Sequence, residues 1–588
     1  MPPTLYLQGF VQTLKNKYSL ISCFLICVSI MVIRFAYTDR QAQLPVKVTT
    51  WDALGYYMYL PAQFIYHDEK NLNWFPKIDS LYALTGGNLY QANKQENGNY
   101  VFKYLEGVSI LQLPFFLIAY SITGFTSYPQ DGFSYPYQLA VAWGCIIWCM
   151  IAIFLLRNIL LRYYNDCTVA VTLVLLLIAS NFLQYVSVEG GQSHGYIFPM
   201  YVFLLYFTIR WHEKRSWLSA FFIGGIIGLA TISRPTELVM IFIPILWNVR
   251  NGKDFNEKVM SLFEYPSQMI SVAVGFWIGI LPQLLYWKRV TGSFVYDVGS
   301  KWDFLNPHFR VLFGWEKGWF IYTPVTLLFV AGLFMLRGKE FSRAVMTFCV
   351  LNIYIIIAWH IWRYGGSYSC RALVQSYPVF AFPLAACVSY LLEKKWRLIS
   401  ISIFSFLVIV NLFQIYQYNR TIIHYDDMNF EYYRAIYLDP DPDALDMSLL
   451  DTKDIIKNEK DFQMTTLFSG KKDENIEDGA VLFDEMISVQ GNSEKGIWYK
   501  IITTIFVEQG LWGSSLQATL SGNGNAQEIH FRMANALTSE QHLNTYSFYI
   551  KPEDKMRNGP YHFQIIVSGN SSFKGKLNTF EVLSFKKN

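Results

Sequence analysis

Long apolar segments recur along the first 420 residues of this 588-residue chain, and they restrict the fold to that of a membrane protein. Crossing a bilayer requires about 17–25 apolar residues. Such windows lie at 18–37, 138–158, 167–187, 195–211, 216–233, 235–249, 267–288, 318–336, 342–360, 371–392 and 397–418. Only 16% of the residues are charged, which is too few for a soluble surface of this length. The sequence therefore predicts a polytopic α-helical membrane protein with about eleven transmembrane helices.

A further apolar stretch at 107–125 decides the orientation of every segment that follows it. If this stretch does not cross the membrane, the basic clusters of the short loops all lie on the cytoplasmic side, as the positive-inside rule requires. These clusters include Lys17, Arg157, Arg215, Arg250, Arg337 and Lys395. The stretch also contains Pro114 and is followed by a polar turn at 128–132. We expect it to lie along the outer membrane face or to dip into it.

This topology divides the chain into a membrane unit and an external C-terminal domain. Residues 1–420 form the predicted membrane unit, in which 38–137 is a large external loop with membrane-surface helices. Residues 421–588 form the external C-terminal domain, in which a polar linker around 439–443 precedes the predicted strands. This region has short alternating segments at 480–489, 498–507, 528–533, 545–550, 561–567 and 579–585, separated by Gly, Asn and Ser turns. The pattern predicts an antiparallel β-sandwich with a jelly-roll-like arrangement.

Charged and aromatic residues gather in the predicted external loops and at the outer ends of helices, whereas the cytoplasmic loops are short and basic. The candidate functional residues are Asp52, Tyr56, Tyr57, Lys103, Glu189, His194, Arg234, Glu237, Trp302, Glu316 and Arg371. Six separate segments contribute them, so the fold must bring distant parts of the chain to one membrane face.

These residue types suit the transfer of a sugar from a lipid phosphate to a hydroxyl group. A carboxylate must accept the proton of the acceptor, and Asp52 fits this role. Fixed cations must hold the phosphate as its negative charge develops, and Lys103, Arg234 and Arg371 fit that role. Partial burial is expected to raise the pKa of Asp52 towards working pH.

Structural interpretations of the same residues remain open. Asp52 is also suited to capping a helix N-terminus. Arg234 and Arg371 are also suited to reaching lipid headgroups from helix ends, and Arg363 is better explained in that way than as a ligand. His194 is equally suited to ordering its loop by a hydrogen bond to Glu189. The C-terminal domain is equally suited to be a spacer or a stabilising module without a sugar-binding site.

The motifs of the external loops resemble those of the GT-C superfamily of integral-membrane glycosyltransferases, which includes aminoarabinose transferases and protein O-mannosyltransferases. The resemblance rests on Trp51–Tyr57 after the first helix, on Lys103–Gly107, on Ser233–Thr236 and on Tyr364–Leu373. It implies a polyprenyl-phosphate-linked sugar donor, a glycan, lipid or protein hydroxyl as acceptor, and transfer with inversion. It also implies a multi-pass protein of the bacterial inner membrane, with its active site and C-terminal domain in the periplasm.

Two features qualify what the resemblance implies. Many family members carry adjacent acidic residues at the first-loop site, but here Asp52 is followed by Ala53, so a divalent cation is left open as a cofactor. The external domain is similar to that of arabinosyltransferases, where such domains bind carbohydrate, and this implies the same role here.

Other functional classes compete with the enzyme. A transporter or flippase of lipid-linked glycans is one, although no charged residue lies well inside a predicted span, where transporters keep their substrate groups. A scaffold that recruits glycans without catalysis is another. Nucleic acid is not an expected partner, because the net charge is only +4 and no block of like charges occurs.

Overall fold

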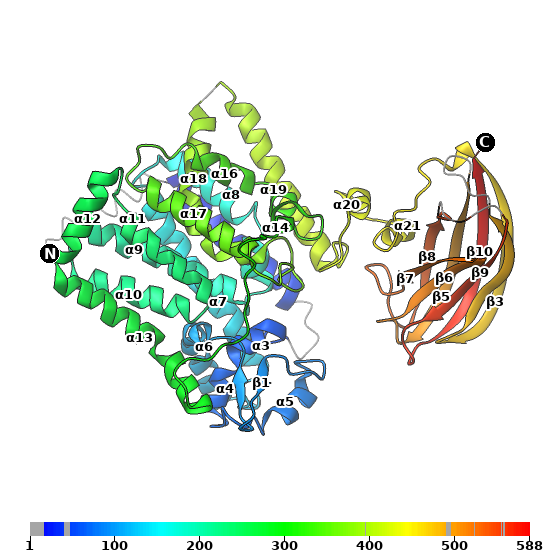
Figure 1. Cartoon of the computed structure of the whole chain (residues 1–588), viewed down its shortest axis with the longest axis horizontal. Coiled ribbons are helices and arrows are strands. Elements are labelled where there is room, and N and C mark those ends of the chain that lie inside the picture. The colour runs from blue at the N-terminus through cyan, green and yellow to red at the C-terminus, as the bar shows by residue number, and fades with distance from the viewer. Residues whose placement is uncertain are drawn as a thin grey trace. The chain divides into compact units, whose positions relative to one another are not determined.

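The computed structural model describes residues 17–39, 47–393, 395–489, 496–522, 524–553, 556 and 559–587. The chain divides into two compact units, Met1–Ile415 and Tyr416–Asn588. Figure 1 shows that the first unit is helical and that strands occur mainly in the second. Several long apolar helices and a C-terminal β-rich domain therefore confirm the predicted fold class.

Each of the eleven apolar windows contains helical structure. The corresponding helices are α2 (Lys17–Arg34), α7 (Tyr135–Leu160), α8 (Asp166–Leu177), α9 (Ser193–Glu213), α10 (Trp217–Thr231), α11 (Phe242–Leu246), α13 (Pro266–Thr291), α16 (Thr326–Leu333), α17 (Ser342–Ile357), α18 (Tyr377–Glu393) and α19 (Arg397–Asn419). Among the described residues, five helical segments are each long and apolar enough to cross a membrane, namely 17–39, 135–160, 266–291, 371–393 and 397–419. The number of crossings and the side on which the loops lie stay predictions.

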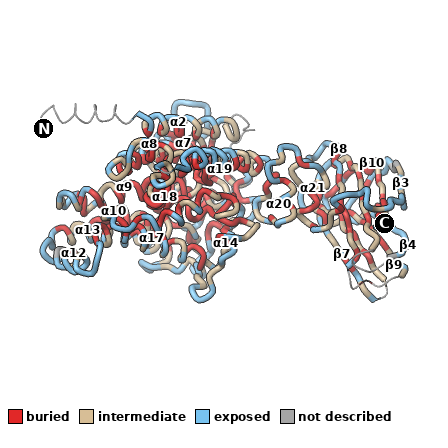
Figure 2. The backbone as a smooth tube through the Cα atoms, turned by 90° about the horizontal axis from the view of Figure 1, so that it is seen from above, coloured by how far each residue is buried: buried red, intermediate tan, exposed pale blue. Residues whose placement is uncertain are grey.

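The helices differ in how far their apolar side chains are covered by protein. The segment at 371–393 is 94% buried in its most apolar window, whereas the one at 266–291 is only 17% buried. Exposed side chains on α13 include Ile270, Trp277 and Ile278. Figure 2 shows the buried residues concentrated in the interior of the unit. Since contiguous exposed apolar surface is costly in water, these outer helices fit contact with lipid.

Glycine residues allow α10 and α13 to pack closely. A Cβ atom added at Gly224 would lie 1.9 Å from the Val272 carbonyl oxygen, and one at Gly275 would lie 2.1 Å from the Phe221 oxygen. Gly228 and Gly279 meet in the same way one turn further along. Small residues at this spacing are typical of closely packed membrane helices.

The long loop that is predicted to be external folds into a small subdomain. It contains α3 (Trp51–Tyr57), α4 (Tyr59–Phe64), α5 (Phe75–Tyr82), the paired strands β1 (Ala92–Lys94) and β2 (Tyr100–Phe102), and α6 (Gly107–Thr123). Its core includes Tyr57, Tyr59, Phe102, Phe116 and Tyr137, and the pairs Tyr57–Phe116 and Tyr59–Phe102 pack edge to face. The subdomain therefore has its own rigid core. Whether α6 crosses the membrane stays a prediction.

The remaining short elements connect the membrane helices. They are α12 (Gly252–Glu264), α14 (Arg310–Phe313), α15 (Trp319–Tyr322), the 3-10 helices η3 (Pro235–Ile241) and η4 (Arg371–Ser376), and the π-helical turns η1 (Phe35–Asp39) and η2 (Gln184–Val188).

The second unit contains a β-sandwich. Its strands are β3 (Phe462–Glu477), β4 (Val481–Val489), β5 (Ile497–Gln509), β6 (Ser515–Gly522), β7 (Asn525–Arg532), β8 (His542–Ile550), β9 (Gly559–Ser568) and β10 (Lys574–Lys587). They form two four-stranded antiparallel sheets, in the orders β3-β10-β5-β8 and β4-β9-β6-β7. This is the strand order of a jelly roll. Buried residues of both sheets, such as Ile501, Phe563 and Phe580, form the core between them.

The polar linker expected around 439–443 is part of a folded segment. Helices α20 (Phe430–Ile436) and α21 (Ala444–Ser448) lie here, and Asp443 caps the second of them. Arg532 of the sandwich donates to Asp451 at 2.8 Å, and Lys551 N donates to Asp454 at 2.8 Å. The segment therefore packs on the sandwich, because its acidic residues pair with groups of the sheet edge.

Candidate active site

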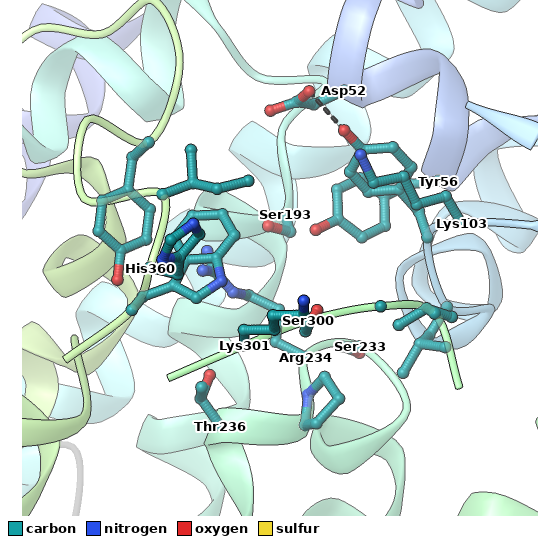
Figure 3. A pocket seen from close by; sticks show the side chains of 18 of the residues that line it. Asp52, Tyr56, Lys103, Ser193, Ser233, Arg234, Thr236, Ser300, Lys301 and His360 are labelled. Atoms are coloured by element: carbon teal, nitrogen blue, oxygen red, sulfur yellow. Dashed lines mark hydrogen bonds between the residues drawn. The ribbon is translucent and has the colours of Figure 1, made fainter. Parts of the chain in front are cut away.

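A cavity of about 440 Å³ opens between helix ends and the loop that is predicted to be external (Figure 3). Seven of the eleven candidate residues line it, namely Asp52, Tyr56, Lys103, His194, Arg234, Trp302 and Arg371. Residues from the first loop, from α9, from the turn before η3 and from the loop before η4 thus meet around one space.

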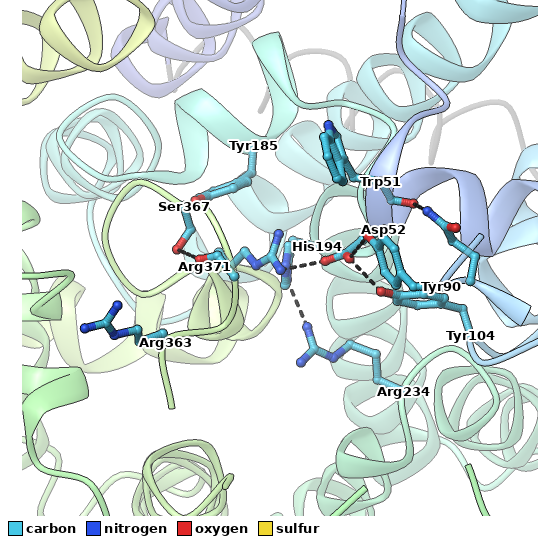
Figure 4. Close-up of polar contacts among 12 residues, drawn as sticks. Trp51, Asp52, Tyr90, Tyr104, Tyr185, His194, Arg234, Arg363, Ser367 and Arg371 are labelled. Atoms are coloured by element: carbon cyan, nitrogen blue, oxygen red, sulfur yellow. Dashed lines mark hydrogen bonds and ion pairs between the residues drawn. The ribbon is translucent and has the colours of Figure 1, made fainter. Parts of the chain in front are cut away.

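Asp52 lies in the first turn of α3, directly after Trp51, whose φ of 51° is unusual for a non-glycine residue. Its Oδ1 atom accepts hydrogen bonds from Tyr104 Oη at 2.6 Å and from Tyr90 Oη at 2.9 Å. Thr50, and not Asp52, occupies the N-cap position of α3. The capping interpretation of Asp52 is therefore wrong, and its carboxylate is aimed at the cavity (Figure 4).

The motif around Asp52 has a glycine because Tyr104 packs directly against α3. A Cβ atom added at Gly55 would lie 2.0 Å from the Tyr104 ring. Tyr59 Oη donates to the Tyr104 carbonyl oxygen at 2.7 Å, which fixes the backbone of the same residue. The two motifs Trp51–Tyr57 and Lys103–Gly107 therefore form one structure.

Arg371 approaches Asp52 from the opposite side. Its Nη2 atom donates to Asp52 Oδ2 at 2.6 Å, and the two side chains are only 11% and 23% exposed. The loop before Arg371 has positive φ at Tyr364 and Ser369, a backbone conformation that costs free energy and often occurs at functional sites. Lys317 Nζ donates to the Arg363 carbonyl oxygen at 3.0 Å and also to the Gly365 oxygen, which ties this loop down.

The pKa of Asp52 lies below its ordinary value, so the rise expected from burial is wrong. Burial by itself raises the pKa of this carboxyl group. The charge of Arg371 and the hydrogen bonds from Tyr104 and Tyr90 oppose that effect and exceed it. The lowered pKa favours the ionised form of Asp52, whose two oxygens accept hydrogen bonds from Tyr104, Tyr90 and Arg371.

Arg234 and Lys103 both line the cavity, and the segments that carry them pack against each other. A Cβ atom added at Gly107 would lie 2.3 Å from Ser233 Oγ, and Gly107 N donates to the Ile232 oxygen at 2.8 Å. This close approach places the Lys103–Gly107 motif against the turn that carries Arg234. Arg234 Nη1 lies 3.3 Å from His194 Nδ1 (Figure 4).

The extended segment after α13 forms another wall of the cavity, with Lys301 and Trp302 lining it. Trp302 forms an antiparallel bridge with Trp359, and His360 N donates to the Lys301 oxygen at 3.1 Å. The exposed Asp303 pairs with His360 at 3.1 Å, and hydrogen bonds from His360 lower the pKa of its carboxyl group. Backbone pairing and the contacts of Asp303 with His360 and His308 therefore hold this wall in place.

Four candidate residues do not line the cavity. Tyr57 is fully buried in the loop core, and its hydroxyl donates to the Gly132 oxygen at 2.5 Å. Glu189 accepts a hydrogen bond from Gln184 at 3.2 Å, and burial raises the pKa of its carboxyl group. Glu237 is 1% exposed and bonds to Gln375 and Tyr201. Glu316 is also absent from the lining.

Sequence reasoning missed several residues of this site. Tyr90 and Tyr104 hold Asp52, and Gln375 bonds to His194 at 2.9 Å. The hydrogen bond expected between His194 and Glu189 does not form among the described residues, since His194 turns to Gln375 instead. Tyr104 adjoins Lys103 in a motif that the sequence did reveal, but no local signal marks Tyr90 or Gln375.

The described lining does not fit a divalent cation. Asp52 is its one carboxylate, and Arg371, Tyr90 and Tyr104 already bind the oxygens of that group. No group of three or more His, Cys, Asp or Glu side chains suited to a metal occurs in the part of the chain that the structure describes. We therefore assign no reaction step to a metal.

Comparison with known proteins identifies one related family. Residues 133–275 match the family model of dolichyl-phosphate-mannose-protein mannosyltransferases. This match confirms the resemblance to the GT-C membrane glycosyltransferases for the segment that runs from the end of the first external loop into α13.

Other similarities are more limited. The chain is 31% identical over 136 residues to the protoheme IX farnesyltransferase of Flavobacterium johnsoniae, which covers 21% of this chain and 42% of that protein. Two structures of the Archaeoglobus fulgidus oligosaccharyltransferase are also similar. The apo form gives a TM-score of 0.40 at 13% identity, covering 72% of this chain and 58% of the other. The form tethered to an acceptor peptide gives 0.39 at 12% identity, covering 70% and 56%. The chain thus spans about half the length of these relatives, and such likenesses decide neither its fold nor its activity.

Proposed function

We propose, from the confirmed resemblance of residues 133–275 to GT-C membrane glycosyltransferases, that this chain transfers a sugar from a polyprenyl-phosphate-linked donor to a hydroxyl group of a glycan, lipid or protein. The observation that carries the proposal is the meeting of the carboxylate Asp52 with the cations Lys103, Arg234 and Arg371 around one cavity. A sugar phosphate needs cations for its phosphate and a base for the acceptor.

In this mechanism the hydroxyl oxygen of the acceptor attacks the anomeric carbon of the sugar while Asp52 takes the hydroxyl proton. The lipid phosphate leaves from the opposite face of the sugar, which inverts the configuration. Arg371 is suited to serve both groups. It gives one N–H to Asp52, and its planar guanidinium has further N–H groups for a phosphate oxygen. Arg234 and Lys103 neutralise the remaining charge of the leaving phosphate.

The base strength of Asp52 then depends on the donor. While Arg371 serves Asp52 alone, the lowered pKa makes the carboxylate a weak base. A phosphate that shares the guanidinium weakens this pairing, so Asp52 becomes a stronger base when the donor is bound. The proposed setting is the bacterial inner membrane, with the cavity and the sandwich in the periplasm. We extend the proposal to carbohydrate binding by the sandwich, whose β4-β9-β6-β7 sheet exposes polar side chains such as Asp484, His530 and Gln564.

The test uses the full chain in nanodiscs with decaprenyl-phosphate-linked mannose, glucose and galactose, together with an envelope extract that supplies acceptors. We expect release of decaprenyl phosphate with at least one of these donors and transfer of the sugar to a component of the extract. Movement of intact donor between leaflets of proteoliposomes, without cleavage, would support a flippase instead. Binding of glycans without either event would support a scaffold.

A further inference from the structure

A chain of hydrogen bonds runs from the cavity to a carboxylate buried beneath it. His194 Nδ1 lies 2.9 Å from Gln375 Oε1, and Gln375 Nε2 donates to Glu237 Oε1 at 3.0 Å. Tyr201 Oη donates to the other oxygen of Glu237 at 2.5 Å. Glu237 and Gln375 are each 1% exposed, whereas His194 lines the cavity. This chain of hydrogen bonds is therefore closed to solvent at Glu237 and reaches the cavity at His194.

The donor and acceptor types fix the direction of these bonds. An ionised carboxylate only accepts, so with Glu237 ionised the amide nitrogen of Gln375 faces Glu237 and its oxygen faces His194. An amide oxygen also only accepts, so Nδ1 of His194 must carry the proton. In a neutral imidazole, Nε2 then keeps its lone pair.

Arg234 competes for the same nitrogen atom. Its Nη1 lies 3.3 Å from His194 Nδ1, and a guanidinium only donates, so this contact would require a lone pair at Nδ1. The Gln375 contact is shorter at 2.9 Å, and Glu237 fixes the orientation of the amide that makes it. The two neighbours therefore demand opposite tautomers, and the buried carboxylate favours the one with the proton on Nδ1.

We propose that Glu237, acting through Gln375, is a positioning residue that holds His194 as the Nδ1-protonated tautomer, so that Nε2 accepts a hydrogen bond from a sugar hydroxyl group. Among the described residues, Nε2 has no hydrogen-bond partner. Lys103, Arg234 and Arg371 can only donate, so a ring nitrogen with a free lone pair gives the cavity an acceptor for a hydroxyl hydrogen. The substrate part of this inference rests on the proposed function, but the tautomer does not.

The tautomer can be measured without any substrate. The full chain, labelled with ¹⁵N in its histidine rings, is placed in nanodiscs for solid-state NMR, and the His194→Gln spectrum identifies the His194 signals by difference. We expect a protonated Nδ1 and an unprotonated Nε2 in the wild type. In Gln375→Met, Arg234 is free to donate to Nδ1, so the proton should move to Nε2.

A control variant separates this effect from general disturbance of the core. Asn352 is 3% exposed and donates to Ser376 Oγ at 2.9 Å, but it does not touch His194. Asn352→Leu should therefore keep the wild-type tautomer. An Nε2-protonated ring in the wild type, or an unchanged ring in Gln375→Met, would overturn the proposal. If Gln375→Met does not fold, the wild-type spectrum alone decides.

Kinetic measurements then test the substrate part. With an active donor, Gln375→Met should raise KM by up to about tenfold, the usual effect of one hydrogen bond. The same substitution should change kcat much less. An unchanged KM together with an altered tautomer would remove the sugar contact. A correct tautomer in a protein that cleaves none of the donors would instead count against the proposed function.

Discussion

Arg371 and Asp52 form a 2.6 Å ion pair although 319 positions separate them in the chain. Both side chains are largely buried, and removing one partner of such a pair leaves an uncompensated charge that costs far more free energy than the intact pair contributes. The pair also joins the first external loop to η4, the two segments that supply the proposed base and a proposed phosphate ligand. Changes at either residue should therefore affect both chemistry and stability.

Asp52→Asn should lower turnover by about 10²–10⁴-fold, the usual share of a general base, and the variant should still fold although it is less stable. The measurement is release of decaprenyl phosphate from the active donor. Glu69→Gln is the matched control, because Glu69 lies in the same external loop and pairs with Arg289 at 3.2 Å, away from the cavity. Unchanged turnover in Asp52→Asn would remove Asp52 from the mechanism.

The pH dependence of stability should reveal the lowered pKa of Asp52. A carboxyl group whose pKa is lower in the folded state stabilises the protein fully above its unfolded pKa, about 3.9 for aspartate, and loses this contribution as pH falls through the folded value. Arg371→Met removes the charge that lowers the pKa and leaves burial, which opposes ionisation, so acidification should cost this variant less stability than the wild type, or stabilise it. The test measures the thermal unfolding temperature of each variant at pH values from about 3 to about 7. Arg363→Met should behave like the wild type, and identical curves for both variants would contradict the assignment.

Arg234→Lys and Arg371→Lys should each weaken binding of decaprenyl phosphate by about tenfold or more. Lysine keeps the charge but loses the two-pronged guanidinium geometry, worth about 1.5–3 kcal/mol for a charge-assisted hydrogen bond. The double variant should lose less than the sum if both residues hold one phosphate. Titration calorimetry in nanodiscs measures the effect, with Arg363→Lys as the control because Arg363 does not line the cavity. Full additivity would argue for separate sites.

Two neighbouring glycines of α10 should respond differently to the same substitution. Gly224→Ala places a methyl group 1.9 Å from a carbonyl oxygen of α13, and such overpacking typically costs about 1–3 kcal/mol. At Gly225 the nearest atom would be 3.7 Å away, an ordinary contact, so Gly225→Ala should be neutral or slightly stabilising. Thermal unfolding in detergent compares them, and equal stability of the two variants would contradict the packing described for α10 and α13.

The predicted topology can be tested with reporters. Alkaline phosphatase fused after residue 420 should be active, since it needs the periplasm, whereas a fusion within 211–216 should be inactive. Green fluorescent protein at the same positions should give the opposite pattern. Equal behaviour at both positions would exclude the eleven-span arrangement and the external site with it.

The sequence by itself determined the membrane class, the positions of the helices and most of the strands, because these depend on local composition and on residue period. Hydropathy placed helical structure in all eleven windows. Alternation predicted six of the eight strands, but it missed β3 and β6. The second half of β3 is mostly polar, whereas β6 does alternate, with Leu516, Ala518 and Leu520 buried. The local pattern also showed which loops carry charged and aromatic residues.

Only the tertiary structure decided which of those residues share a site. Tyr56 and Tyr57 are neighbours in one motif, yet Tyr56 lines the cavity and Tyr57 lies in the loop core, because successive residues of a helix point about 100° apart. The partners of Asp52 come from positions 38, 52 and 319 residues away. No local pattern encodes such contacts, since they arise when separately folded segments pack, and that packing also reversed the expected pKa shift of Asp52 by placing Arg371 beside it.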